Sequence, residues 1–82
     1  MPEITYDELF AFLGRLGFRE AATSALDVVW EHPDHGMVLV LPRGLGSDPV
    51  RGADTLSVET RLQYHGLVEG SVQRAILAAR VH

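Results

Sequence analysis

Alternating and continuous runs of apolar residues indicate a pair of strands at the centre of the chain, residues 26–42. Leu26, Val28 and Trp30 fall on one face of the first strand, which has the period of a half-buried strand. The second strand, residues 37–41, is apolar at every position, so its pattern does not indicate which face is buried. The Pro-Asp-His-Gly sequence between them is typical of a tight turn. The pattern therefore predicts an antiparallel hairpin with the first three residues on its covered face.

An amphipathic helix is predicted before the hairpin. Thr5 and Glu8 have the spacing of a capping box, and Gly17 is suited to end the helix in the left-handed conformation. Six apolar residues between these signals fall on one broad helix face: Tyr6, Leu9, Phe10, Phe12, Leu13 and Leu16. A short strand over residues 18–22 follows. With the hairpin it makes a three-stranded antiparallel meander.

The C-terminal half predicts a long loop and two more helices. Residues 43–53 contain three glycines and one proline, which is typical of a flexible loop. The second helix is expected to begin at Asp54 or Ser57 and to end at Gly66, and the third to span residues 69–80. The third helix has four small or apolar residues on its inner face: Val72, Ala75, Ile76 and Ala79. The predicted class is α+β in the order α-β-β-β-α-α, with the helices on one face of the meander.

Composition limits the chain to one small domain. A length of 82 residues leaves room for a single core, so we expect one domain over residues 1–82. The chain has no cysteine, which excludes disulfides and thiolate metal sites and favours the reducing cytoplasm. We see neither the features of a signal peptide nor an apolar run of about 20 residues, and we therefore expect no membrane partner.

Charge is unevenly distributed along the chain. The net charge is −4, with seven acidic residues against two arginines in residues 1–41 and four against five in residues 42–82. Phosphate binding depends on local positive charge, so any RNA binding is expected to be weak. The candidate phosphate contacts are the arginines of the second half: Arg43, Arg51, Arg61 and Arg74.

Four short motifs accompany this order of elements: Leu-Gly-Phe at 16–18, Trp-Glu-His-Pro at 30–33, Val-Leu-Val-Leu-Pro at 38–42 and Arg-Leu-Gln-Tyr-His-Gly-Leu at 61–67. In these motifs the chain resembles the HicA-type toxins of bacterial toxin–antitoxin pairs, whose fold is similar to double-stranded RNA-binding domains. The resemblance implies a small ribonuclease that cuts translated messages and is silenced by an antitoxin protein.

The chain departs from this family at the catalytic position. The family carries a Gly-Ser-(His or Asn)-His segment entering its second strand, and the last histidine is catalytic. Here that segment falls on residues 25–28, so the catalytic position is Val28, which has no proton to exchange. The chain is also neither basic nor lysine-rich, and its loop 43–53 is longer than the family's. We therefore expect the fold to carry over without the catalytic residue.

Other residues offer weaker candidates for chemistry. His32 and His35 flank the hairpin turn with Asp34 between them, and either histidine is a substitute base for RNA cleavage. One turn supplies too few ligands for a usual zinc site, so no metal and no cofactor is expected. His65 is assigned a structural role. Asp27 and Glu31, on the outer face of one strand, are interpreted as solvated carboxylates, and His82 as a disordered terminal residue.

An interface is the last prediction. Helices can cover only one face of the sheet in so short a chain, so the other face exposes apolar residues, assigned here as Val29, Met37, Leu39 and Leu41. The expected partner is a second copy of the chain or an antitoxin-like protein. The leading hypothesis is a catalytically degenerate HicA-like module that binds a protein or structured RNA. The alternatives are an active endoribonuclease with a relocated histidine and a non-catalytic homodimeric interaction protein.

Overall fold

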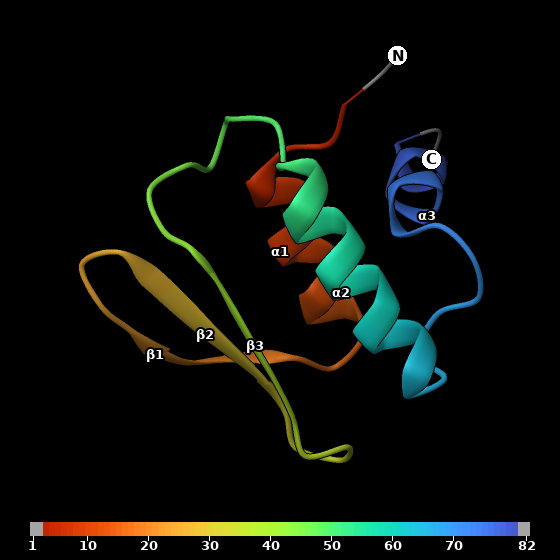
Figure 1. Ribbon diagram of the computed structural model, residues 1–82, viewed down its shortest axis with the longest axis horizontal. Coiled ribbons are helices and arrows are strands. Elements are labelled where there is room, and N and C mark those ends of the chain that lie inside the picture. The colour runs from red at the N-terminus through yellow and green to blue at the C-terminus, as the bar shows by residue number, and fades with distance from the viewer. Residues whose placement is uncertain (1–2, 81–82) are drawn as a thin grey trace.

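The structure, a computed structural model, describes residues 3–80 and has three helices and one three-stranded sheet in that range (Figure 1). In chain order the elements are α1 (Tyr6–Arg15), β1 (Arg19–Thr23), β2 (Asp27–His32), β3 (Met37–Pro42), α2 (Gly52–Tyr64) and α3 (Val72–Ala79). The strands form an open antiparallel sheet in the order β1-β2-β3. The predicted α+β class and order of elements are therefore confirmed.

Both ends of α1 follow from local sequence signals. At its start the Thr5 hydroxyl accepts a hydrogen bond from the Glu8 N–H at 3.2 Å, and the Glu8 carboxylate accepts one from the Thr5 N–H at 3.0 Å. At its end Gly17 has a φ of 103°, and the Phe18 N–H donates to the Leu13 carbonyl at 3.0 Å. These are the bonds of a capping box and of a Schellman motif. The predicted start and stop of the helix are confirmed.

The register of the sheet decides which of its faces the helices cover. Val28 lies opposite Leu41, and His32 lies opposite Met37, and all four side chains are buried. Between them on β3, Leu39 is also buried, whereas Val38 and Val40 are exposed. Since directly opposite residues share a face, the covered face consists of alternate residues that begin with Val28.

Two details of the strand prediction are wrong. β1 begins at Arg19, and Phe18 instead precedes it as a core residue that is 5% exposed. Leu26, expected on the covered face, is 76% exposed. The Ser24 hydroxyl oxygen accepts the N–H groups of Leu26 and Asp27, at 3.3 and 3.0 Å. This local turn places Leu26 outside β2 and away from the core.

The second helix begins earlier than predicted. Its first residue is Gly52, after the N-cap Arg51, whose side chain makes no capping hydrogen bond. Asp54, one of the two predicted caps, instead lies in the first turn and accepts a hydrogen bond from the Tyr6 hydroxyl at 2.6 Å. The predicted stop is confirmed, because Gly66 has a φ of 72° directly after the end of the helix.

The third helix is shorter than predicted. It begins at Val72, and the hydroxyl of the N-cap Ser71 accepts the Arg74 N–H at 3.1 Å. Val72 and Ile76 are buried, whereas Ala79, expected on the inner face, is exposed. Val72 and Ile76 therefore supply the buried side chains of α3.

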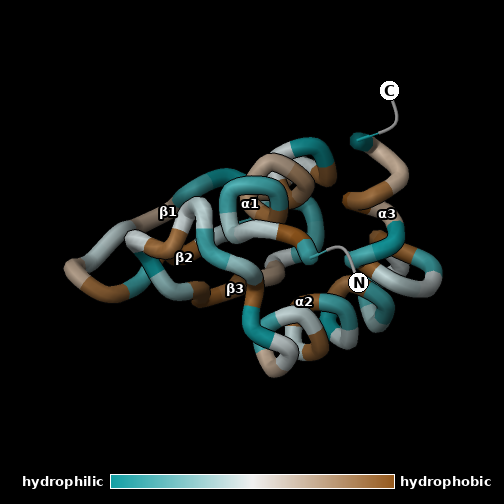
Figure 2. The backbone as a smooth tube through the Cα atoms, turned by 90° about the horizontal axis from the view of Figure 1, so that it is seen from above, coloured by the Kyte–Doolittle hydropathy of each residue, from teal (hydrophilic) through white to brown (hydrophobic). Residues whose placement is uncertain are grey.

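The core lies between the covered face of the sheet and the three helices. Each helix alternates hydrophilic and hydrophobic segments along its length, as amphipathic helices with one buried face do (Figure 2). The buried cluster draws on every helix and on β3: Ile4, Leu9, Phe12, Leu13, Phe18, Met37, Leu39, Leu41, Val58, Leu62, Val72 and Ile76. Among residues 3–80, no helix has both the length and the apolar composition needed to span a membrane.

The glycine-rich loop is fastened to the start of α1. The Tyr6 N–H donates to the Asp48 carbonyl at 3.2 Å, and the Asp7 N–H donates to the Gly46 carbonyl at 3.0 Å. These two bonds satisfy donors that a helix start otherwise leaves unpaired. The loop runs over residues 43–51, because residues 52 and 53 belong to α2. The loop thus presents two backbone carbonyls to the first turn of α1.

Candidate functional site

The face of the sheet away from the helices, called here the open face, carries an apolar strip. Val38 is 40% exposed and Val40 is 59% exposed. The register places Val29 opposite Val40 and Ala22 opposite Val29, so a row of small apolar side chains crosses all three strands. The apolar strip is therefore formed by Ala22, Val29, Val38 and Val40.

A charged pair borders the strip on one side. Arg19 lies opposite Glu31, and Glu31 lies opposite Val38, so the three side chains form the next row of the open face. The Arg19 guanidinium donates to the Glu31 carboxylate at 3.2 Å. Asp27 is exposed at the opposite border of the strip, where it pairs with Pro42.

Three of the four predicted interface residues lie elsewhere. Met37, Leu39 and Leu41 are 1%, 2% and 3% exposed and belong to the core, so their assignment to the open face is corrected. Val29 keeps its predicted place on the open face. β3 contributes Val38 and Val40 instead. Its run of residues 37–41 is apolar on both faces, so the register with β2 decides which face is covered.

The outer edge of β3 exposes backbone groups. The Arg43 N–H donates to the Leu26 carbonyl at 2.9 Å, which makes this opposite pair a hydrogen-bonded one. Because hydrogen-bonded pairs alternate along an antiparallel ladder, the N–H and C=O groups of Val38 and Val40 point away from β2. Pro42 falls at the next outward position, where its missing N–H costs the ladder nothing. We call the outward groups of Val38 and Val40 the free edge.

The two edge strands of the sheet, β1 and β3, differ in how well they are protected from pairing with another chain. β1 carries Arg19 and Glu20 and has an irregular register between Glu20 and Ala22. Charges and bulges are common features that keep an edge strand from pairing with another chain. β3 has none of these between Met37 and Leu41. The free edge of β3 is therefore the unprotected one.

Three histidines form a row that runs from the end of β2 through the hairpin turn to the end of α2. The rings of His32 and His35 lie edge to face with centroids 4.7 Å apart, and the centroids of His35 and His65 are 5.9 Å apart. His35 is exposed, His65 is half-buried and His32 is 5% exposed. The sequence placed only His32 and His35 near one another. The approach of His65 depends on how the end of α2 meets the hairpin, which no local pattern indicates.

His32 acts as a structural residue in this row. Its Nε2 lies 2.8 Å from the Leu16 carbonyl oxygen, which can only accept, so Nε2 carries the proton. Its Nδ1 is buried and has no hydrogen-bond partner. A Cβ added at Gly17 would lie 2.9 Å from the same Nε2. The close packing of this ring leaves no room for a substrate at Nε2.

The remaining catalytic and metal candidates gain no support from the geometry. Val28, at the position of the family's histidine, is 4% exposed and packs in the covered face. Asp34 is exposed on the hairpin turn. No three His, Cys, Asp or Glu residues within the described chain are arranged to hold a metal ion. His82 lies outside the described residues.

The candidate RNA contacts come from separate elements. Arg43 follows β3 and donates to the Ser24 carbonyl at 2.9 Å. Arg51 precedes α2 and Arg61 lies in its last turn, and a rise of 1.5 Å per residue separates them by about 15 Å. Arg74 lies in α3. All four are exposed, but they do not converge on one point.

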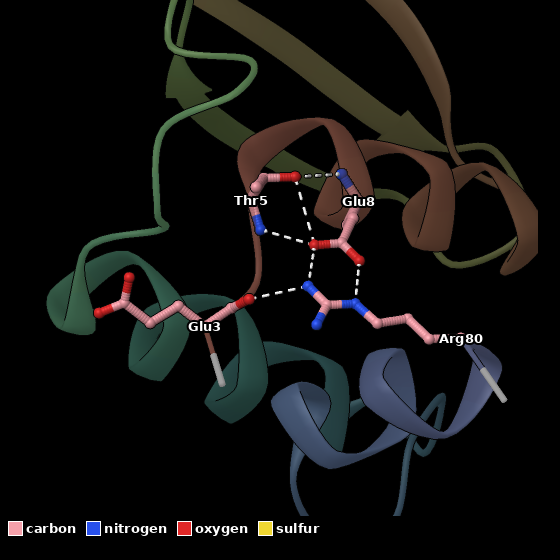
Figure 3. A network of polar contacts seen from close by, with 4 residues as sticks. All are labelled: Glu3, Thr5, Glu8 and Arg80. Carbon is pink, nitrogen blue, oxygen red and sulfur yellow. Dashed lines mark hydrogen bonds and ion pairs between the residues drawn. The ribbon is translucent and has the colours of Figure 1, made fainter. Parts of the chain in front are cut away.

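A fifth arginine is occupied by an ion pair. Arg80 binds both carboxylate oxygens of Glu8 and donates to the Glu3 carbonyl at 2.8 Å, which joins the end of α3 to the start of α1 (Figure 3). Glu8 also caps α1 through Thr5. The hydrogen bonds from Arg80, and secondarily that from the Thr5 N–H, lower the pKa of Glu8 to about 2.

A cleft lies on another side of the molecule. It has a volume of about 390 Å³ and runs between the N-terminal segment, α2 and the start of α3. Its walls carry two carboxylates, those of Glu3 and Glu59, and the Glu59 carboxylate accepts the Val72 N–H at 2.7 Å. No histidine or arginine lines it. It therefore offers no acid–base pair near a phosphate-binding group.

Comparison with known proteins does not identify the chain. No family model, no curated protein and no solved structure matches it. The resemblance to HicA-type toxins therefore rests on the four sequence motifs.

Proposed function

We propose that this chain is a HicA-like module without catalytic activity, which works in the cytoplasm by binding a protein partner through its sheet. The observation that carries the proposal is the apolar strip, where Val38 and Val40 are 40% and 59% exposed beside an unprotected strand edge. Exposed apolar surface next to unpaired backbone groups is characteristic of a protein interface.

The state of the histidines supports a role without catalysis. Val28 has no ionisable group, and His32 is buried with its Nε2–H donated to the Leu16 carbonyl. A general base must reach the proton that it removes. Val28 cannot accept a proton, and the buried His32 cannot reach one on a substrate, so neither residue meets this condition.

A ribonuclease with a relocated histidine is the second candidate. It is favoured by His35, an exposed imidazole whose ring centroid lies 5.9 Å from that of His65. Two neighbouring imidazoles can supply a general base and a general acid. However, the candidate phosphate contacts lie on separate elements, and the domain carries a net charge of −4. The protein-binding role is therefore preferred.

Site-specific photocrosslinking tests the proposal, because it captures a bound protein whatever its identity. The photoreactive residue p-benzoylphenylalanine replaces Val40 on the open face, and in a control it replaces Leu56, which is 63% exposed on α2. We expect one discrete protein adduct from position 40 in the cells that make the chain, and none from position 56. Adducts to RNA alone, or equal labelling from both positions, would contradict the proposal.

A further inference from the structure

The free edge of β3 has a short and well-defined set of hydrogen-bonding groups. Val38 and Val40 each point one N–H and one C=O away from β2. On one side Pro42 offers only a carbonyl. On the other side Gly36, with a φ of 60°, lies in the turn and not in the strand. A partner strand therefore has two complete residues with which to pair.

We infer that the occupant of this edge is β3 of a second copy of the chain, paired antiparallel about a two-fold axis at Leu39. The two sheets then form one continuous sheet of six strands. This inference rests on the proposed protein-binding function and names its partner. A two-fold interface uses the same patch on both copies, so one edge supplies both sides.

Hydrogen-bond register selects the position of the axis. Bonds form only where outward-pointing residues face one another, so the axis passes through a residue. The registers centred on the free edge have the axis at Val38, Leu39 or Val40. With the axis at Leu39, Val38 faces Val40 of the second copy and Val40 faces its Val38. Four N–H···O=C bonds then satisfy every group of the free edge.

The other two registers leave groups unpaired. With the axis at Val40, the Val38 carbonyl faces Pro42 of the second copy, which has no N–H to donate. With the axis at Val38, Val40 faces Gly36, whose positive φ takes it out of the extended conformation. An unpaired backbone group at an interface loses its hydrogen bond to water without replacement. The register centred on Leu39 is the one in which Val38 and Val40 lose no hydrogen bond in this way.

Charge placement on the open face is compatible with this pairing. In the six-stranded sheet, Glu31 lies beside Val38, and Val38 lies beside Val40 of the second copy, so no carboxylate faces another. The two copies of Glu31 are separated by three strand spacings, about 14 Å, which exceeds the Debye length of about 8 Å in physiological salt. Each Glu31 also remains paired with Arg19 at 3.2 Å. Meanwhile, the valines of the two apolar strips become cross-strand neighbours, a favourable pairing of β-branched side chains.

Engineered cysteines test the inference, because the natural chain has none. We expect the double variant Val38→Cys/Val40→Cys to give a disulfide-linked dimer under mild oxidation. Opposite residues in a hydrogen-bonded pair lie about 5.5 Å apart between Cα atoms, within disulfide range. The single variants should cross-link poorly, since each cysteine then lies diagonally from its copy. Leu26→Cys, 76% exposed outside the strands, is the control for random collision.

Each other pattern of cross-linking overturns the inference. Efficient linkage of Val40→Cys alone would move the axis to Val40, and linkage equal to that of Leu26→Cys would exclude edge pairing.

Sedimentation equilibrium supplies a second measure, for which we expect a dimer with the natural chain. Val40→Pro, which removes an N–H that β2 does not use, should raise the dissociation constant at least tenfold, whereas Val40→Thr should not. An unchanged dimer in a folded Val40→Pro variant would also exclude the edge.

The photocrosslinking experiment separates the two proposals. An adduct of position 40 with a different protein, together with a monomeric natural chain, would overturn the self-association and leave the binding function standing. An adduct with the mass of two chains supports both. The lack of any adduct, together with a monomer, would overturn both.

Discussion

The imidazole of His32 donates its Nε2–H to the Leu16 carbonyl across 2.8 Å and so fastens the end of β2 to the end of α1. Gly17 leaves the space for this contact, since a Cβ there would lie 2.9 Å from the nitrogen. The glycine that ends the helix therefore also accommodates the buried histidine.

This double role predicts different costs for two glycines that both end helices. Gly17→Ala should lower the free energy of unfolding by about 2–3 kcal/mol, because a positive φ costs an alanine about 1–2 kcal/mol and the new methyl group also displaces the His32 ring. Gly66→Ala is the matched control, with a φ of 72° and nothing within 4 Å of the added Cβ, so only the conformational cost applies. Urea unfolding of both variants measures the difference. Equal losses of unfolding free energy in the two variants would show that the His32 ring moves aside without destabilising the fold.

The Tyr6 hydroxyl is expected to contribute to stability. It donates to Asp54 at 2.6 Å and accepts the Arg51 N–H at 3.3 Å, so it connects α1 to the start of α2. Tyr6→Phe should cost about 1–2 kcal/mol of unfolding free energy, because these groups lose a partner. Tyr64→Phe, at a residue that is 87% exposed, should cost nothing measurable. Thermal unfolding followed by circular dichroism compares the two variants, and similar midpoints would refute the role of the hydroxyl.

The ion pair of Glu8 and Arg80 predicts a loss of stability in acid. The pKa of Glu8 is about 2 in the folded chain against an ordinary value of 4.5, so the folded state favours the ionised carboxylate. Its contribution is complete above pH 4.5 and is lost as the pH falls towards 2. Glu8→Gln should therefore be less stable than the natural chain at pH 7, and the difference should shrink by pH 2. Urea midpoints across this range test the prediction, with Glu69→Gln, an exposed residue, as the control.

No cleavage of RNA is expected from the purified protein. The test is incubation with total RNA, and expression in bacteria should likewise cause no growth arrest. Matched His32→Ala, His35→Ala and His65→Ala variants distinguish true activity from a contaminating nuclease. Cleavage that the His35 or His65 variant abolishes would establish the relocated base. Cleavage that all variants retain would point to contamination.

Binding to duplex RNA is expected to be weak. If Arg43, Arg51, Arg61 and Arg74 all contacted phosphates, the logarithm of the binding constant would fall with that of the salt concentration with a slope of about −0.9 per contact. Because these arginines lie on separate elements of an acidic chain, we expect a slope shallower than that for two contacts. Fluorescence anisotropy of a labelled duplex measures it. Submicromolar affinity with a steep slope would contradict the prediction.

Signals confined to a few neighbouring residues were sufficient to predict the ends of α1, the stop of α2 and the hairpin. The Thr5–Glu8 capping box and the glycines at 17 and 66 act through hydrogen bonds to the backbone groups of neighbouring residues. Such hydrogen bonds form whenever these few residues adopt the capping conformation, without help from residues far away in the chain. The order of elements and the α+β class followed from these signals together with the apolar periodicity.

The candidate interface required the tertiary structure. Met37 to Leu41 is apolar at every position, so nothing in the strand itself distinguishes Leu39, 2% exposed, from Val40, 59% exposed. The same holds for His65, which reaches His35 only because α2 ends beside the hairpin. The sequence by itself determined the order of the helices and strands, since the apolar period and the capping signals of each element are local. Pairing with β2 and packing against the helices decided which side of β3 faces water, because burial is a property of residues far apart in the chain.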